Sequence, residues 1–191
     1  MSELSAPPWA TPLVGFRSRK AAQLCIYFAM KSEGTIEKLK LINLLYFAER
    51  KFLCENHYPM LFDEYYSLKY GPVCSNTLNG INGVIHEEIW DEYIARNSNT
   101  VVAIKSISRD ELDEVSDAEL SVVDEIWKEF GHMTASQLRN YSHKNCPEYT
   151  ETEGRIPISY KQILRAVGEE DADVLANDIE EMIDLDVTLS D

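Results

Sequence analysis

The segment from Glu37 to about Glu55 constrains the fold more than any other part of this 191-residue chain. It contains good helix formers, and one apolar set recurs every three to four residues: Leu41, Leu44, Leu45, Ala48 and Phe52. A second set widens this stripe until it covers most of the circumference: Ile42, Tyr46, Phe47 and Leu53. Because a helix that is apolar on nearly all sides is buried, the sequence predicts a central core helix here.

Shorter segments with helical periodicity surround this one. Residues 21–30 place their apolar positions on one face, and Gly34 ends that helix. Ser116 with Glu119 forms a capping box ahead of a helix that Gly131 closes. Thr134 with Gln137 repeats the device and starts a helix through about residue 142, followed by a polar loop over 143–155. A further helix is predicted over 159–167, so the fold is mostly helical.

The β-like segments are few and short. Residues 64–70 are aromatic and partly alternating, as in a strand, and Gly71-Pro72 stops the pattern. Proline at the first helical position loses no hydrogen bond, so we expect Pro72 to open a helix through about residue 81. Residues 88–95 and 100–107 could pair as a hairpin. The predicted fold class is α+β, predominantly α-helical, as a single compact domain with a small antiparallel β-sheet or hairpin.

Charge divides the chain into three parts. Residues 1–18 begin with a proline-containing stretch of little periodicity and form an N-terminal lead-in, and residues 19–168 form the domain. Residues 169–191 contain ten acidic side chains and no Lys or Arg, which makes them an acidic C-terminal extension that could form an amphipathic helix. The formal net charge is −15, and without this extension it is −5. A surplus of negative charge opposes direct binding to nucleic acid, because phosphate backbones require a cationic surface.

The sequence also bears on location. No apolar stretch reaches the roughly 18 residues of a membrane span, and the N-terminus lacks the pattern of a secretory signal, so we expect a cytoplasmic protein without membrane contact. The four cysteines lie far apart, without a CxxC pair: Cys25, Cys54, Cys74 and Cys146. This spacing disfavours disulfides and a four-thiolate zinc site, and buried thiols are expected.

Motifs with a strong catalytic mechanism are absent from the sequence: it contains no GxxxxGK[ST], GxGxxG, GxSxG or HExxH. His143 precedes Cys146 by three residues, and an imidazolium can lower the pKa of a thiol, so this loop is the candidate for an enzymatic function. A structural, hydrogen-bonding histidine explains the same pattern. We therefore predict no catalytic residues, no metal site and no cofactor.

An aromatic cluster could serve packing or recognition. It consists of Tyr46, Phe47, Tyr65, Tyr66 and Tyr70. Stacking on nucleobases would require surrounding basic charge, which is lacking. Core packing and an exposed anchor for a protein partner remain the two interpretations.

Two motifs in this order resemble a known family. The run Lys40-Leu41-Ile42-Asn43-Leu44-Leu45-Tyr46-Phe47-Ala48, followed about twenty residues later by Tyr70-Gly71-Pro72-Val73, resembles the Panacea domain of SocA-like antitoxins and phage-associated GepA-like proteins. The region from Leu138 to His143, with Pro147-Glu148-Tyr149 and residues 158–163, is similar to the closing part of that domain. The sequence departs from the family pattern at Ile42, Asn43, Ser142 and Tyr149, and near Leu68.

The resemblance implies an antitoxin of a prokaryotic or prophage toxin–antitoxin system that neutralises its cognate toxin by direct binding. It equally allows a proteolytic adaptor that delivers a toxin to a bacterial protease. An uncharacterised enzyme that uses the His143/Cys146 loop is the third hypothesis. The oligomeric state stays open.

Residues of the two motifs are assigned structural roles. Leu44, Leu45, Tyr46 and Phe47 are expected to anchor the core. Gly71, Pro72 and Val73 are expected to set the turn, where Gly71 would be needed for a positive φ. The predicted contact surface for the toxin consists of Tyr66, Lys69 and Tyr70, with His143 at its edge.

Overall fold

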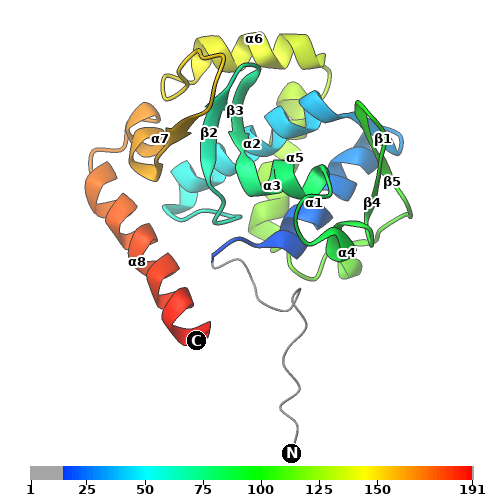
Figure 1. Ribbon diagram of the computed structural model, residues 1–191, viewed down its shortest axis with the longest axis horizontal. Helices are drawn as coiled ribbons and strands as arrows, with labels where there is room; N and C mark the ends of the chain where they lie inside the picture. The colour runs from blue at the N-terminus through cyan, green and yellow to red at the C-terminus, as the bar shows by residue number, and fades with distance from the viewer. Residues whose placement is uncertain (1–14, 191) are drawn as a thin grey trace, which may run out of the picture.

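The computed structural model describes residues 15–190 and is predominantly helical with two small antiparallel sheets (Figure 1), as the predicted α+β class requires. Residues 1–14 of the predicted lead-in lie outside the described part. The helices are α1 (Ser18–Lys31), α2 (Lys38–Asn56), α3 (Ser75–Ile81), α4 (Glu87–Trp90), α5 (Asp117–Phe130), α6 (Ala135–Asn145), α7 (Tyr160–Ala166) and α8 (Ala172–Ser190), with a 3₁₀ turn η2 (Arg109–Glu111). The strands are β1 (Thr35–Glu37), β2 (Tyr65–Leu68), β3 (Gly71–Cys74), β4 (Ile94–Arg96), β5 (Thr100–Ala103) and β6 (Ile156–Ile158).

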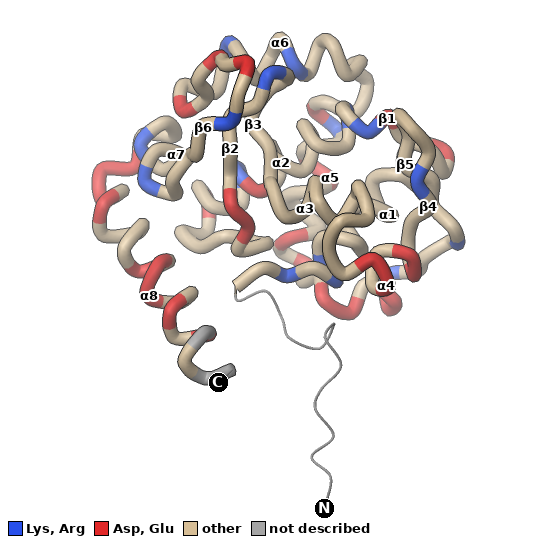
Figure 2. The backbone as a smooth tube through the Cα atoms, viewed as in Figure 1, with Lys and Arg blue, Asp and Glu red and all other residues tan. Residues whose placement is uncertain are grey.

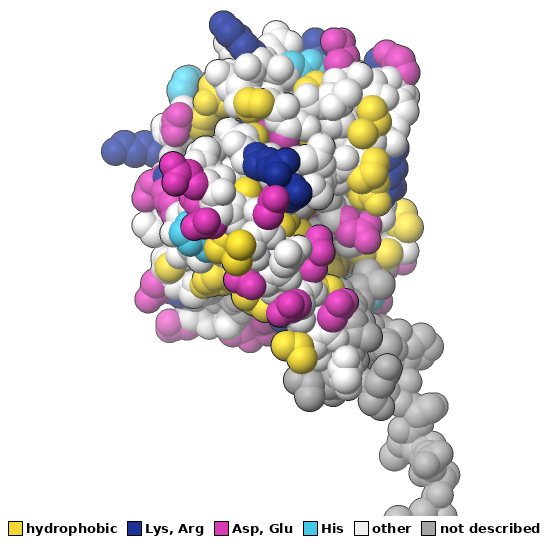
Figure 3. Space-filling model, turned by 90° about the vertical axis from the view of Figure 1, so that its left-hand side faces the viewer, with side chains coloured by type: hydrophobic (Ala, Val, Ile, Leu, Met, Phe, Trp, Pro, Cys, Tyr) yellow, Lys and Arg dark blue, Asp and Glu magenta, His cyan; other side chains and the backbone are white. Residues whose placement is uncertain are grey.

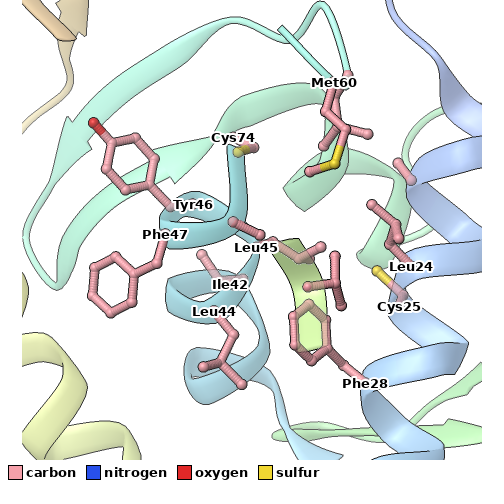
Figure 4. Packing of buried hydrophobic residues seen from close by; sticks show 14 of the residues in the cluster. Leu24, Cys25, Phe28, Ile42, Leu44, Leu45, Tyr46, Phe47, Met60 and Cys74 are labelled. Carbon is pink, nitrogen blue, oxygen red and sulfur yellow. The ribbon is translucent and has the colours of Figure 1, made fainter. Parts of the chain in front are cut away.

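Helix α2 occupies the centre of the molecule, as its all-round apolar surface predicts. Leu44 and Leu45 are fully buried, Tyr46 is 1% exposed and Phe47 is 5% exposed. Leu45 lies on the side of α1, whereas Tyr46 and Phe47 point to the opposite side (Figure 4). Helix α2 therefore joins two halves of one core.

Strands β2 and β3 form a hairpin where the sequence predicted a strand followed by a helix. Ser67 is paired with Pro72 and Leu68 with Gly71, so the turn contains only Lys69 and Tyr70. The prediction that Pro72 opens a helix is therefore wrong. Strand β3 is an edge strand of the sheet β3-β2-β6, a position that tolerates a residue without an N–H group. The helix begins later, at Ser75.

The second sheet has the order β1-β5-β4. The predicted hairpin exists between β4 and β5, but it is shorter than expected because residues 87–90 form α4. Strand β1 directly precedes α2 and pairs with β5, from Thr35 with Val102 to Glu37 with Thr100. Strand β1 has only three residues, which are too few for a recognisable alternation of apolar and polar positions in the sequence.

Side-chain caps fix the starts of α5 and α6, two helices that pack on α2. Both predicted capping boxes are present: Ser116 accepts from the N–H of Glu119, and Thr134 accepts from that of Gln137, each at 3.2 Å. Such a cap contributes about 1 kcal/mol. Helix α6 continues to Asn145, three residues beyond the predicted end. His143 therefore lies on a helix and not in a loop.

Helix α8 forms in the acidic extension and packs through a narrow stripe. Ala172, Ala176 and Ile179 are buried, while Val174, Met182 and Leu185 are exposed. Acidic positions recur along its length and no basic position interrupts them (Figure 2). On the face that α7 and α8 form, acidic and apolar side chains lie next to one another (Figure 3).

Candidate partner-binding surface

The turn of the β2–β3 hairpin lies beside α6 (Figure 1). Tyr70 is 51% exposed at this turn. Lys69 is also exposed and forms an ion pair with Glu153, with 2.8 Å between Nζ and Oε2. Both partners face solvent, so this ion pair adds little stability. The turn thus presents a large aromatic side chain and a cation to solvent.

Gly71 is held between two helices. Its φ is 123°, a value that favours glycine. A Cβ atom at this position would lie 2.9 Å from Oγ of Ser142 on α6 and 3.4 Å from Oδ1 of Asn43 on α2. The glycine therefore permits both the backbone conformation and the close approach of hairpin, α2 and α6.

The segment after α6 attaches to the hairpin. Tyr149 donates a hydrogen bond from its hydroxyl to the carbonyl of Leu68, at 3.0 Å, and the N–H of Thr150 donates to Oγ of Ser67 at the same distance. His143 stacks on Tyr149 with 4.4 Å between ring centroids and an interplanar angle of 21°. Lys69, Tyr70, His143 and Tyr149 thus lie around one hairpin end. We call these four residues the hairpin–α6 surface.

Tyr66, the remaining predicted contact residue, lies apart from this surface. Its ring is covered by the Arg155 guanidinium, 3.6 Å from the ring centroid. It lines a hollow of about 500 Å³ together with Glu64, Pro157 and Glu180. The structure thus brings together three of the four predicted contact residues and places Tyr66 toward α8.

Buried contacts of Glu148 connect α2 to the segment that carries Tyr149. The Tyr46 hydroxyl donates to Oε1 of Glu148 at 2.9 Å, and Nε of Arg50 donates to the same oxygen at 2.6 Å. The Glu148 side chain is fully buried. A buried carboxylate without partners would be costly, so these two donors fix the start of the segment that carries Tyr149.

A second buried carboxylate fixes the hairpin to α2. Glu49 accepts hydrogen bonds from the Tyr65 hydroxyl at 2.6 Å and from the N–H of Leu61 at 3.2 Å. Burial raises the pKa of Glu49 to about 7, although both hydrogen bonds favour the charged form. Glu49 therefore changes protonation near neutral pH.

Asp63 holds the other end of the hairpin by capping α3. Its carboxylate accepts from the N–H groups of Asn76 and Thr77, at 2.7 and 2.9 Å, and from Oγ1 of Thr77 at 2.7 Å. The N-cap position of α3 is Cys74, which makes no side-chain cap. Asp63, twelve positions before the first residue of α3, thus satisfies free N–H groups of that helix and complements the helix dipole.

His143 and Cys146 do not form an activated pair. Burial raises the pKa of the Cys146 thiol to about 12, with a further contribution from Glu148. Burial and the nearby Arg139 lower the pKa of His143. At neutral pH this arrangement favours a thiol and an uncharged imidazole, which is the opposite of what a thiolate nucleophile requires.

Several residues that build this surface were not identified from the sequence. Glu49 interrupts the apolar stripe of α2 between Leu45 and Phe52, a signal that could have identified a buried carboxylate. Glu148 and Tyr149 belong to the motif region, but their contacts depend on residues 102 and 81 positions away. No local pattern predicts such contacts.

A comparison with protein families identifies the family of the chain. The family described as antitoxin SocA-like, Panacea domain, matches residues 41–148, and the chain belongs to this family. The matched part extends from α2 to Glu148 and includes the hairpin and α6. No curated protein and no solved structure matches the chain. The family assigns the chain the general role of an antitoxin, whose partner is a toxin.

Residues 15–190 lack two further kinds of feature. None of their helices combines the length and hydropathy of a membrane span. Within the same range, no three His, Cys, Asp or Glu side chains are grouped as metal ligands would be.

Proposed function

We propose that the chain is the antitoxin of a prokaryotic or prophage toxin–antitoxin pair and that it neutralises its toxin in the cytoplasm by direct binding, without a cofactor. The hairpin–α6 surface makes the contact. Tyr66 and Arg155 extend it toward α8. This proposal keeps Tyr66, Lys69, Tyr70 and His143 as contact residues.

The observation that carries the proposal is the exposure of Tyr70 on a rigid support. Tyr70 directly precedes Gly71, which α2 and α6 hold in place. Tyrosine is favoured at protein interfaces because it buries a large area at a small entropic cost. The net charge of −15 additionally favours a basic partner.

Growth rescue tests this function. The open reading frame beside the gene is expressed alone and together with the chain in a bacterial host. The proposal expects toxicity from the neighbouring protein, rescue by the wild-type chain and a complex on size exclusion. Tyr70→Ala should weaken rescue. Tyr58→Ala is the matched control, because Tyr58 is 44% exposed and follows the C-terminal end of α2, whereas Gly71 at the turn approaches Asn43 in the first half of that helix. Absence of both rescue and a complex would refute the proposal.

Helix α8 favours a second candidate, a proteolytic adaptor. Val174, Met182 and Leu185 expose apolar side chains among acidic ones, a pattern suited to docking. Deletion of residues 169–191 would also remove the buried Ala176 and Ile179, so substitution is the better test. Replacing the three exposed residues by Ser should leave toxin binding intact. If the chain is an adaptor, the same variant should stop degradation of the toxin; unchanged degradation would exclude this use of α8.

A further inference from the structure

An apolar pocket of about 200 Å³ lies at the base of the hairpin turn. Its walls come from three elements: Leu39 and Ile42 of α2, Leu68 and Val73 of the hairpin, and Leu78 of α3. Tyr70 and Gly71 also line it. Protein interiors are close-packed and an unfilled apolar cavity costs stability. A pocket of this size next to an exposed tyrosine is therefore suited to a side chain supplied from outside.

Besides Tyr70, the pocket is lined by one polar side chain, that of Asn43, which has an unused acceptor. Asn43 is 1% exposed, and its Nδ2 donates to the carbonyl of Leu39 at 2.8 Å. Its Oδ1 has no hydrogen-bond partner among the residues that the structure describes. Buried polar atoms are nearly always hydrogen-bonded, so the free acceptor of Asn43 points to a missing donor.

We propose that this pocket receives one large apolar side chain of the toxin and that Oδ1 of Asn43 accepts a hydrogen bond from an N–H group of the same toxin segment. The proposal rests on the antitoxin function and adds the chemistry of the bound segment. The apolar walls of the pocket favour an apolar side chain of the toxin. The free Oδ1 of Asn43 requires an N–H group next to that side chain. The excess of acidic side chains in the whole chain favours a basic protein as the source of this segment.

Two substitutions test the pocket by different routes. Leu39→Trp fills it from its half-buried rim, and Asn43→Leu removes the acceptor while keeping a similar volume. Val167→Trp is the matched control, because Val167 lines a different hollow, of about 480 Å³, bordered by α2, α5 and α6. Binding of the protein encoded by the adjacent open reading frame is measured by calorimetry, and the thermal midpoint of each variant is measured alone.

The proposal expects Leu39→Trp and Asn43→Leu each to weaken binding by about tenfold or more, the effect of one lost buried hydrogen bond or anchor. Val167→Trp should leave the affinity within about twofold, a change of only a few tenths of a kcal/mol. Asn43→Leu should keep or raise the thermal midpoint, since it removes an unpaired acceptor; a purely structural Asn43 would lower it. If one variant does not fold, the other decides.

The outcomes distinguish the pocket assignment from the antitoxin function on which it rests. Wild-type affinity in both pocket variants would overturn the pocket assignment while leaving the antitoxin function intact. Failure of the wild-type chain to bind would overturn the antitoxin function and the pocket assignment with it.

Discussion

The Tyr46 hydroxyl on α2 donates a hydrogen bond to the carboxylate of Glu148, 102 residues later in the chain. This contact joins the beginning of the family match to its end, since the match covers residues 41–148. Arg50 completes the site from the next turn of α2. The core helix thus directly determines where the segment with Tyr149 and the hairpin meet.

Substitutions around Glu148 should differ in severity. Tyr46→Phe removes one hydrogen bond and should cost about 1–2 kcal/mol of unfolding free energy, because Arg50 still neutralises the carboxylate. Arg50→Met leaves a charge buried without its cation and should cost roughly 3 kcal/mol or more. Urea denaturation of the two variants measures both values. Equal and small losses would show that Glu148 does not depend on Arg50.

Gly71 should be sensitive to substitution for two reasons, which a control can separate. Gly71→Ala meets an unfavourable φ and the hydroxyl of Ser142, so it should cost roughly 3 kcal/mol. Gly34 has a φ of 89° but no atom within 4 Å of an added Cβ, so Gly34→Ala should cost about 1 kcal/mol from the backbone alone.

The same contact predicts a rescue. In a Ser142→Ala background, the nearest remaining Ser142 atom to the added Cβ is the Ser142 Cβ, at 4.0 Å. Gly71→Ala should therefore cost about 1 kcal/mol less in this background than in the wild type. A double-mutant cycle from denaturation measurements gives this difference. An unchanged cost would mean that the hydroxyl does not limit the approach of the hairpin.

Stability should depend on pH through Glu49. Its pKa in the folded state, about 7, lies above the ordinary value of 4.5. The folded state therefore binds the proton more tightly than the unfolded state. The resulting stabilisation is fully present below pH 4.5 and is lost as the pH rises through 7. Its maximum is roughly 3 kcal/mol.

Glu49→Gln isolates this contribution from that of all other acids. The amide oxygen can still accept from Tyr65, but the side chain no longer titrates. Unfolding free energies measured between pH 5 and pH 8 should fall less steeply for the variant than for the wild type. Parallel curves for the two proteins would contradict the role assigned to Glu49.

The sequence predicted the elements whose signals are local. The apolar positions of α2 recur at helical spacing, so its central place followed directly. Ser116 and Thr134 mark helix starts because their caps involve residues only three positions away.

The features that the sequence did not predict depend on residues that are distant in the chain. Pro72 is compatible with a helix start and with an edge strand, and only its pairing with Ser67 decides between them. Strand β6 has three residues and is defined by β2, some ninety positions earlier. The contact of Tyr149 with Leu68 and the close approach at Gly71 likewise arise from tertiary packing. The sequence therefore predicted Lys69, Tyr70 and His143 only as separate candidates, whereas the structure shows that they lie around one hairpin end.

Hydrogen–deuterium exchange of the chain with and without the protein encoded beside it tests the location of the binding surface most directly. We predict that binding slows exchange of residues 66–73 and 138–150, which form the hairpin and the part of α6 and its following segment that border it. Exchange in β4 and β5, on the other sheet, should stay unchanged. Protection confined to α8, or to the β1-β5-β4 sheet, would contradict the assignment of toxin binding to the hairpin–α6 surface.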